Sequence, residues 1–112
     1  MRTADPREEV LQGTLQMLVL KALSLEPMHG WGITERLAHW SSDVLRVNQG
    51  SLYPALYQLE QQGMITSSWK MTENKRRARY YRLTPGGRRR LDTEQRSWAR
   101  VSGAVNVVLA VE

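Results

Sequence analysis

The segment 48–65 constrains the fold of this chain most, because it has the pattern of an amphipathic helix that stops at a glycine and continues into a strand. At about 100° per residue, Leu52, Leu56 and Leu59 fall on one narrow stripe. The opposite side gathers Gly50, Tyr53, Pro54, Tyr57 and Gln61. A leucine stripe can bury against a core, and a face with two tyrosines and almost no charge suits contact with base edges. A solvated helix whose tyrosines pack on a neighbour fits the same pattern, so the helix alone does not decide between these two interpretations.

Two β-prone runs follow this helix, at residues 64–69 and 78–83. The connector between them is basic, and it carries Lys70, Lys75, Arg76 and Arg77, with Arg79 just beyond. The pattern predicts a hairpin with a cationic tip. A helix followed directly by a basic hairpin is typical of a winged helix-turn-helix, in which the helix enters the major groove and the wing lies along phosphates or the minor groove. A charge run alone is usually a solvated face, so the prediction depends on both elements together.

Positive charge is concentrated around this hairpin. The chain of 112 residues has a net charge of +5, whereas residues 70–90 hold nine Lys or Arg against one acid, Glu73, an excess of +8. Clustered cations favour polyanions, because neutralised phosphates release condensed counterions. A membrane surface would satisfy the same electrostatic requirement, but these cations lie mainly on a hairpin rather than on a basic amphipathic helix. Double-stranded DNA is therefore the expected partner, and no membrane partner is expected.

Composition excludes several other classes of protein. The chain has no cysteine, which excludes disulfides and thiolate metal sites. No apolar run approaches the ~20 residues that span a bilayer, and the N-terminus lacks a signal-peptide core, so a cytoplasmic protein is expected. His29 and His39 have little acidic company, and we assign both a structural role. No metal or cofactor is predicted.

An enzyme is poorly supported. The sequence offers no cysteine nucleophile, no Ser–His–acid set, no phosphate loop and no carboxylate pair flanking a pocket. A rival from another class is a protein-binding winged helix, which would use the tyrosine face for a partner and the basic wing for solubility. A steep loss of affinity for duplex DNA with salt would separate DNA binding from this rival, because phosphate neutralisation produces a large negative slope.

Capping signals predict further helices before the hairpin. Asp5 followed by Pro6 predicts a helix start, and an apolar stripe that begins at Leu11 and Leu15 continues it to about Leu25. Residues 26–30 read as a turn. A second helix is expected over 31–40, with core spacing at Ile33, Leu37 and Trp40, and Asn48 is a good N-cap for the third. Gly63 should end that third helix.

Pro54 is anomalous, because it lies inside the third helix, where it removes a backbone hydrogen bond. Two interpretations stay open. One is a tolerated kink, and the other is a proline ring that presses against a DNA sugar or a thymine methyl.

After the hairpin, Thr84 and Pro85 restart a helix that runs to the end of the chain. Its apolar stripe consists of Leu91, Trp98, Val101, Val105, Val108 and Leu109. So small a domain cannot cover this stripe, and a second copy of the chain is the economical partner. The expected fold is α+β and mostly helical, with a winged helix-turn-helix DNA-binding domain over residues 1–84 and a dimerisation helix over 85–112. This helix should form one compact unit with the N-terminal helix.

With these residues in view, the chain resembles the PadR family of transcriptional regulators, in its short form with a single C-terminal helix. The matching signatures are the motifs at 29–33 (HGWGI), 50–56 (GSLYPAL), 59–60 (LE), 63–65 (GMI) and 79–84 (RYYRLT), with Gly87. Together they cover about residues 10–91. Each motif alone would be weak, but the combination is specific.

The resemblance implies a homodimeric repressor, often of its own operon and of neighbouring transport or detoxification genes, acting at an inverted-repeat operator. The residues that it and the helix faces assign to DNA are Gln49, Ser51, Tyr53, Pro54 and Tyr57 on the helix and Lys75, Arg76, Arg77 and Arg79 on the wing.

The segment 97–101 (SWARV) is similar to that of multidrug-sensing members, whose dimer pore carries a central tryptophan. The resemblance therefore implies a pore of Trp98, Val101 and Met17 that takes a hydrophobic or aromatic small molecule. The chain departs from those members at Glu94 and Gln95, where they have small or apolar side chains. A tryptophan that only packs in the dimer seam is the alternative.

Overall fold

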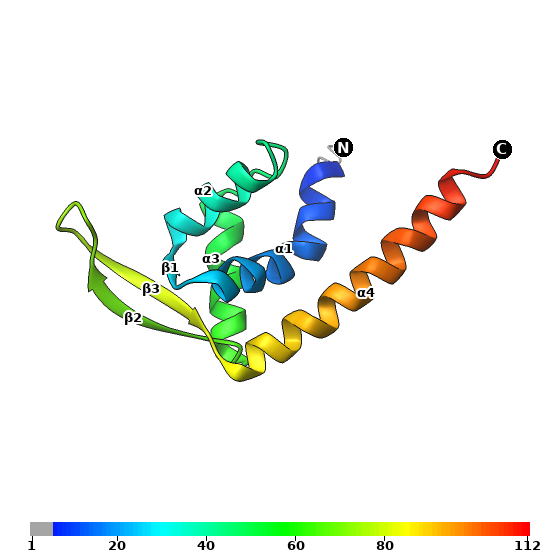
Figure 1. The fold of residues 1–112 in the computed structure, drawn as a ribbon. Coiled ribbons are helices and arrows are strands. Elements are labelled where there is room, and N and C mark those ends of the chain that lie inside the picture. Colours follow the sequence, from blue (N-terminus) through cyan, green and yellow to red (C-terminus); the bar gives the residue numbers. More distant parts are fainter. Residues whose placement is uncertain (1–5) are drawn as a thin grey trace.

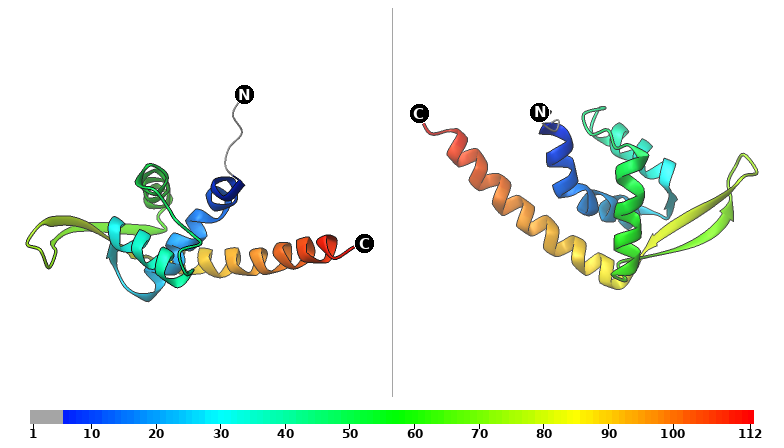
Figure 2. Two further views of the ribbon diagram at one scale, coloured as in Figure 1. Left: turned by 90° about the horizontal axis from the view of Figure 1, so that it is seen from above. Right: turned by 180° about the vertical axis from the view of Figure 1, so that it is seen from behind.

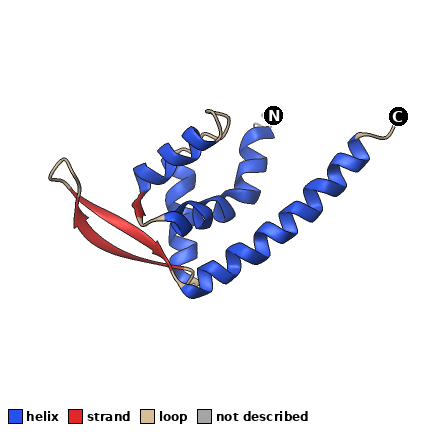
Figure 3. Cartoon of the chain, viewed as in Figure 1, coloured by secondary structure: helices blue, strands red, loops and turns tan. Residues whose placement is uncertain are grey.

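A computed structural model describes the backbone of residues 6–112 and the side chains from residue 14 onward. In chain order, the described residues form α1 (Pro6–Leu25), β1 (Met28–His29), α2 (Gly30–Trp40), α3 (Gln49–Gln61), β2 (Ile65–Met71), β3 (Arg77–Leu83) and α4 (Pro85–Leu109). The helices surround one end of a small sheet, and the β2–β3 hairpin projects from the body as a wing (Figures 1 and 3). The predicted α+β, mostly helical winged helix-turn-helix is confirmed.

Local capping explains where the helices begin. The Asn48 side chain accepts a hydrogen bond of 2.8 Å from the Ser51 backbone N–H, as predicted for the start of α3. Thr84 does the same for Gly87 at 3.0 Å at the start of α4. His29 caps α2 through Nδ1, which accepts from the Gly32 N–H at 3.0 Å, so its predicted structural role is confirmed.

Two further predictions concern the end of α3 and the start of α1. α3 stops as predicted, because Gly63 takes a φ of 76°, which a side chain would disfavour. Asp5 and the side chain of Leu11, which we assigned to the start and apolar stripe of α1, lie outside the described residues.

The sheet has the strand order β1-β3-β2 and is antiparallel throughout. β2 and β3 pair along their full length, from Ile65 opposite Leu83 to Met71 opposite Arg77. β1 pairs Met28 with Tyr81. The sequence predicted a turn over residues 26–30, and this was incomplete, because a strand of two residues is too short to produce an alternating pattern.

One hydrophobic core joins the three N-terminal helices, the base of the sheet and the start of α4. Its fully buried large side chains are Val19, Leu20, Ile33, Leu52, Leu56, Leu59 and Ile65. The leucine stripe of α3 thus faces the core, as predicted. Trp40 was wrongly predicted to be buried: it is exposed, because it is the last residue of α2 and lies beyond the core.

The wing and α4 leave the helical body at the same corner, where β3 ends at Leu83 and α4 begins at Pro85, and they extend to opposite sides (Figure 2). This gives the molecule a long dimension of 57 Å against 34 and 28 Å for the other two. Only the first turns of α4 contain buried residues, namely Gly87 and Leu91, and the rest of the helix stands clear of the body. No helix over the described part of the chain is long and apolar enough to cross a membrane.

Candidate nucleic-acid interface

The exposed face of α3 is mostly uncharged and lies opposite its buried leucines. Tyr53 and Tyr57 are both exposed, with 48% and 66% of their surface accessible, and Gln49 and Pro54 are exposed as well. Ser51 is half-buried, with its backbone N–H engaged by the Asn48 cap. The division of this helix into two faces follows the prediction from the sequence.

Pro54 lies in the second turn of α3, on the exposed face. A proline has no N–H, so the carbonyl four residues earlier, on Gly50, receives no helical hydrogen bond from it. That carbonyl is on the same exposed side of the helix, where water or a ligand can satisfy it. Tolerance of the proline is explained by this position, and its contact with DNA stays a prediction.

The tip of the wing is a tight turn closed by backbone and side-chain hydrogen bonds. The Lys75 N–H donates to the Thr72 carbonyl at 3.0 Å, and the Arg76 N–H donates to Thr72 Oγ1 at 3.2 Å. Lys75 has a φ of 60°, in the left-handed region where glycine is the usual residue. Lys75, Arg76 and Arg77 are all exposed, so the cationic tip was predicted correctly.

Aromatic rings on the wing hold two of its cations. The Arg77 guanidinium lies 5.1 Å from the centre of the Trp69 ring, and Lys70 Nζ lies 5.7 Å from the centre of the Tyr80 ring. Such cation–π contacts orient a charged group without neutralising it, because the ring carries no net charge. The arginine therefore keeps its charge for an anion while its side chain is partly ordered.

Arg79 differs from the other predicted wing cations. Its Nε donates to Ser67 Oγ at 2.7 Å, and its Nη2 lies 3.4 Å from Glu60 Oε1. Ser67 Oγ donates in turn to Glu60 Oε2 at 2.7 Å. Arg79 was predicted to contact DNA together with the other wing cations, and this stays a prediction. In the structure its guanidinium is paired with Glu60 and links the wing to α3.

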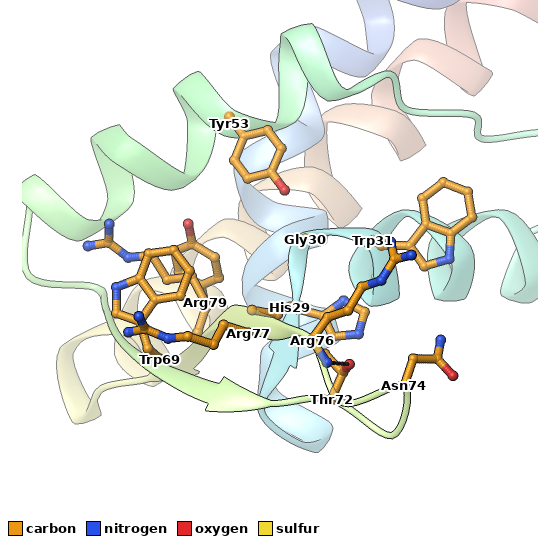
Figure 4. Close-up of a pocket in the computed structure, with 12 residues that line it drawn as sticks. His29, Gly30, Trp31, Tyr53, Trp69, Thr72, Asn74, Arg76, Arg77 and Arg79 are labelled. Carbon is orange, nitrogen blue, oxygen red and sulfur yellow. Dashed lines mark hydrogen bonds between the residues drawn. The ribbon is translucent and has the colours of Figure 1, made fainter.

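A cleft of about 650 Å³ separates the wing from the start of α2 and the face of α3. It is lined by Tyr53 from α3, Trp31 from α2, and Trp69, Arg76, Arg77 and Arg79 from the wing, among others (Figure 4). The remaining predicted residues, Gln49, Ser51, Pro54, Tyr57 and Lys75, lie outside this cleft.

Two of the lining residues, Trp31 and Trp69, were missed by the sequence reasoning. Both are exposed, at 60% and 57%. They fall within the predicted helix 31–40 and the predicted strand 64–69, and a large apolar side chain on a polar surface often marks a contact site. For Trp69, the sequence did hold an indication of exposure, because this residue of β2 falls between a polar and a basic neighbour, Ser68 and Lys70.

Tyr81, on β3, also lines this cleft and is buried. Burial raises the pKa of the Tyr81 phenol above its ordinary value, the positive charge of Arg79 opposes the shift, and Tyr53 and Glu60 add to it. Tyr81 is therefore a neutral core residue beneath the polar surface.

The second predicted site is the apolar stripe of α4. Trp98, Val101, Val105, Val108 and Leu109 are all exposed, with between 46% and 75% of their surface accessible. Leu91 was wrongly included in this stripe. It is only 6% exposed, because the first turns of α4 pack into the chain's own core. Met17 is partly buried and packs against that core too.

Arg90 connects α4 to the other helices just before the stripe begins. It donates to Glu94 at 2.8 Å, to Gln62 after α3 at 3.1 Å, and to Gln16 of α1 at 3.3 Å. Gln16 then donates to Gln58 of α3 at 2.8 Å. Glu94, at which the chain departs from the drug-sensing pattern, is thus engaged by Arg90. These bonds fix the direction in which α4 leaves the body.

The protein is a winged helix-turn-helix protein. It is defined by the helix pair α2–α3, the basic hairpin that follows it in the chain and the long helix α4. Within the part of the chain that the structure describes, no three His, Cys, Asp or Glu side chains gather as a metal site would require. The chemistry of the surface is that of cations, amides and aromatic rings.

Comparison with known proteins supplies the family. A family described as "Transcriptional regulator PadR-like family" matches residues 19–93. Transcriptional regulator Rv3488 of Mycobacterium tuberculosis is 30% identical over 89 residues, which cover 80% of this chain and 79% of that protein. The crystal structure of a PadR family transcriptional regulator from Eggerthella lenta is 32% identical, with a TM-score of 0.79, over 94% of this chain and 89% of that one.

The chain therefore belongs to the PadR-like family of transcriptional regulators, a family of regulators and not of enzymes. It is also 42% identical over 90 residues to an uncharacterised 37.1 kDa protein in transposon TN4556 of Streptomyces fradiae. The match covers 80% of this chain but 24% of that protein, so the chain spans about a quarter of that relative's length.

Proposed function

We propose that this PadR-family regulator is a homodimeric repressor that recognises a specific inverted-repeat operator. The observation that carries the proposal is that Tyr53, on the uncharged face of α3, lies across a cleft from the free cations Arg76 and Arg77 of the wing. Such an arrangement combines readout of base edges with phosphate neutralisation. A regulator of this kind acts where the chromosome is, in the cytoplasm.

In this proposal α3 is the recognition helix and enters the major groove. Tyr53 and Tyr57 present phenol edges to the bases, and Gln49 and Ser51 lie at the end of the helix where recognition helices commonly contact bases. The ring of Pro54 makes apolar contact with a sugar or a thymine methyl. None of these side chains carries a charge, so their contribution depends on base sequence more than on salt.

The wing supplies the part of the DNA-binding free energy that does not depend on the base sequence. Lys75, Arg76 and Arg77 are exposed and lack a carboxylate partner among the described ion pairs, so each is free to replace a counterion on a phosphate. Arg79 serves mainly to hold the wing at its angle to α3, because its charge is already paired with Glu60.

We assign residues 1–84 to DNA binding and 85–112 to dimerisation. Trp98, Val101, Val105 and Val108 are spaced three, four and three residues apart, which is the spacing of a helix seam that packs on another helix. An exposed stripe of this length is covered by a second copy related by a two-fold axis. Two recognition helices would then meet two half-sites of an inverted repeat.

An aromatic effector is the final part of the proposal. Trp98 is half-exposed and lies near the start of the stripe, so in a dimer two indole rings can face one another with Val101 beside them. A flat hydrophobic molecule held between them would alter the spacing of the two recognition helices and release the DNA. The genes controlled would be the chain's own operon and neighbouring transport or detoxification genes.

A titration of duplex DNA at several salt concentrations tests the core of this proposal. The logarithm of the binding constant should fall linearly with the logarithm of salt concentration, with a slope close to about −0.9 per phosphate contacted. A protein-binding winged helix would show no measurable binding to duplex DNA, or a slope too small for more than one phosphate contact, at every salt concentration. Either result would contradict the assignment to DNA.

A further inference from the structure

The Tyr53 ring lies directly over Gly30, at the start of α2 (Figure 4). A Cβ built on Gly30 would lie 2.6 Å from the Tyr53 hydroxyl oxygen, 3.0 Å from Cζ and 3.3 Å from Cε1. Gly30 itself is buried, whereas Tyr53 is half-exposed. One edge of the tyrosine therefore rests on the backbone of α2, and the rest of the ring faces the cleft and the solvent.

Backbone conformation does not explain the glycine at this position. Gly63 is the one glycine with a positive φ in the described chain, so Gly30 has a backbone that any residue can adopt. A glycine in a helix costs stability relative to alanine, because it loses more conformational freedom on folding. The geometry gives a different reason for it, which is that only a residue without a side chain leaves room for the phenol.

We propose that Gly30 is a positioning residue for DNA recognition, and that the absence of its side chain sets the height and angle at which Tyr53 meets the bases. The inference rests on the proposed function, in which Tyr53 contacts base edges. Gly30 itself touches no DNA in this account. It acts through Tyr53 alone, by providing the flat surface on which the phenol end of the ring lies.

The contacting atoms make this proposal testable without loss of the fold. The atoms that an added methyl would meet belong to the far end of a flexible side chain, so the Tyr53 ring can swing away while the backbone stays in place. A Gly30→Ala chain should therefore fold normally, with Tyr53 displaced toward solvent. Its wing is unchanged, so weak binding to random duplex DNA and its salt slope should be unchanged too.

The experiment compares affinities for two duplexes, one selected by the wild-type chain from a random library and one with the same bases scrambled. Gly30→Ala should lower the ratio of the two affinities about tenfold, the size expected for one lost specific contact. Gly32→Ala is the matched control, because its Cβ would meet its nearest neighbours, in His29 and Met28, at ordinary distances of 3.5 Å and more. It should leave the ratio unchanged.

Tyr53→Phe removes the atom in closest conflict with the added methyl. In a chain that already carries Tyr53→Phe, Gly30→Ala should therefore change the ratio several-fold less than in the wild-type chain, and this non-additivity separates positioning from a general loss of stability. Nitration by tetranitromethane gives a readout without DNA. Modification of Tyr53 should rise in Gly30→Ala relative to that of the exposed Tyr57 in the same chain.

Two results would overturn the proposal, and they differ. If wild-type discriminates between the duplexes and Gly30→Ala discriminates equally, Gly30 does not position Tyr53, although the regulator assignment stands. If wild-type fails to discriminate, the proposed function fails, and the role of Gly30 fails with it.

Discussion

Arg79 of the wing and Glu60 of α3 form an ion pair with 3.4 Å between Nη2 and Oε1, and the Ser67 hydroxyl bridges the same two side chains. The pair joins the element that we propose reads bases to the element that we propose contacts phosphates. It also divides the wing cations into one that is neutralised within the chain and others that are free.

Because Arg79 is paired and Arg76 and Arg77 are free, we expect their substitutions to change the salt dependence of DNA binding differently. Replacing Arg76 and Arg77 together by alanine should weaken binding to every duplex and flatten the log–log salt slope by about one per lost phosphate contact. Arg79→Ala should leave the slope close to that of the parent, because its charge is already balanced by Glu60. A double variant with the parent's slope would show that the wing tip does not reach DNA.

Replacing Lys75 by glycine should have opposite effects on the stability of the chain and on its affinity for DNA. Its φ of 60° is costly for any residue with a side chain, by about 1 kcal/mol, and glycine adopts it freely. Lys75→Gly should therefore keep or raise the melting temperature while it lowers the affinity for DNA, because a free cation is lost. Lys75→Ala should lower the affinity equally without the gain in stability. Thermal unfolding and a duplex titration measure the two effects, and unchanged affinity in both variants would exclude a DNA role for Lys75.

The exposed stripe of α4 predicts that Trp98 holds two chains together. Trp98→Ala should weaken the dimer by a few kcal/mol, because a buried indole would be removed from each side of the seam. Sedimentation across a range of concentrations measures this. Trp40→Ala, which removes another exposed tryptophan at the end of α2, should leave the association unchanged.

The same variant separates packing from effector binding. If Trp98 forms an aromatic slot, wild-type fluorescence should be quenched by planar cationic dyes, and Trp98→Ala should stay dimeric but lose the quenching. A monomeric wild-type chain at every concentration would contradict the dimer, and a wild-type dimer without any response to dyes would contradict the effector.

The fold could be predicted from the sequence because its main elements carry strong local signals. The leucine spacing of α3, the Asn48 cap and the glycine at 63 are each determined by neighbouring residues, so they needed no knowledge of distant contacts. The hairpin was found for the same reason, from two β-prone runs around a polar turn. The small strand β1 was missed, because its pairing with β3 depends on tertiary structure alone.

The site was harder to predict than the fold, because it depends on which side chains meet. The sequence grouped Arg79 with the other wing cations as DNA contacts, and only the packing of α3 against the wing shows its pairing with Glu60. Leu91 shares the periodicity of the α4 stripe, yet it is buried because the body covers the first turns of that helix. The proximity of Gly30 to Tyr53, 23 residues away along the chain, carries no local signal at all.

Tyr53 gives the sharpest prediction at a single residue of α3. Tyr53→Ala should lower discrimination between selected and scrambled duplexes by about 1–3 kcal/mol while it leaves much of the weak binding to random DNA. The ratio of the two dissociation constants measures it. Equal discrimination by the variant and the parent would remove Tyr53 from the recognition surface.

The central claim is that two copies of α3 read a two-fold symmetric sequence, and selection of bound duplexes from a random library tests it most directly. Sequencing of the recovered duplexes should reveal two matching half-sites in inverted orientation, with their centres about one helical turn or a multiple of it apart, ~34–36 Å per turn. Recovery of duplexes that share no common sequence, or of a single unrepeated half-site, would contradict the account.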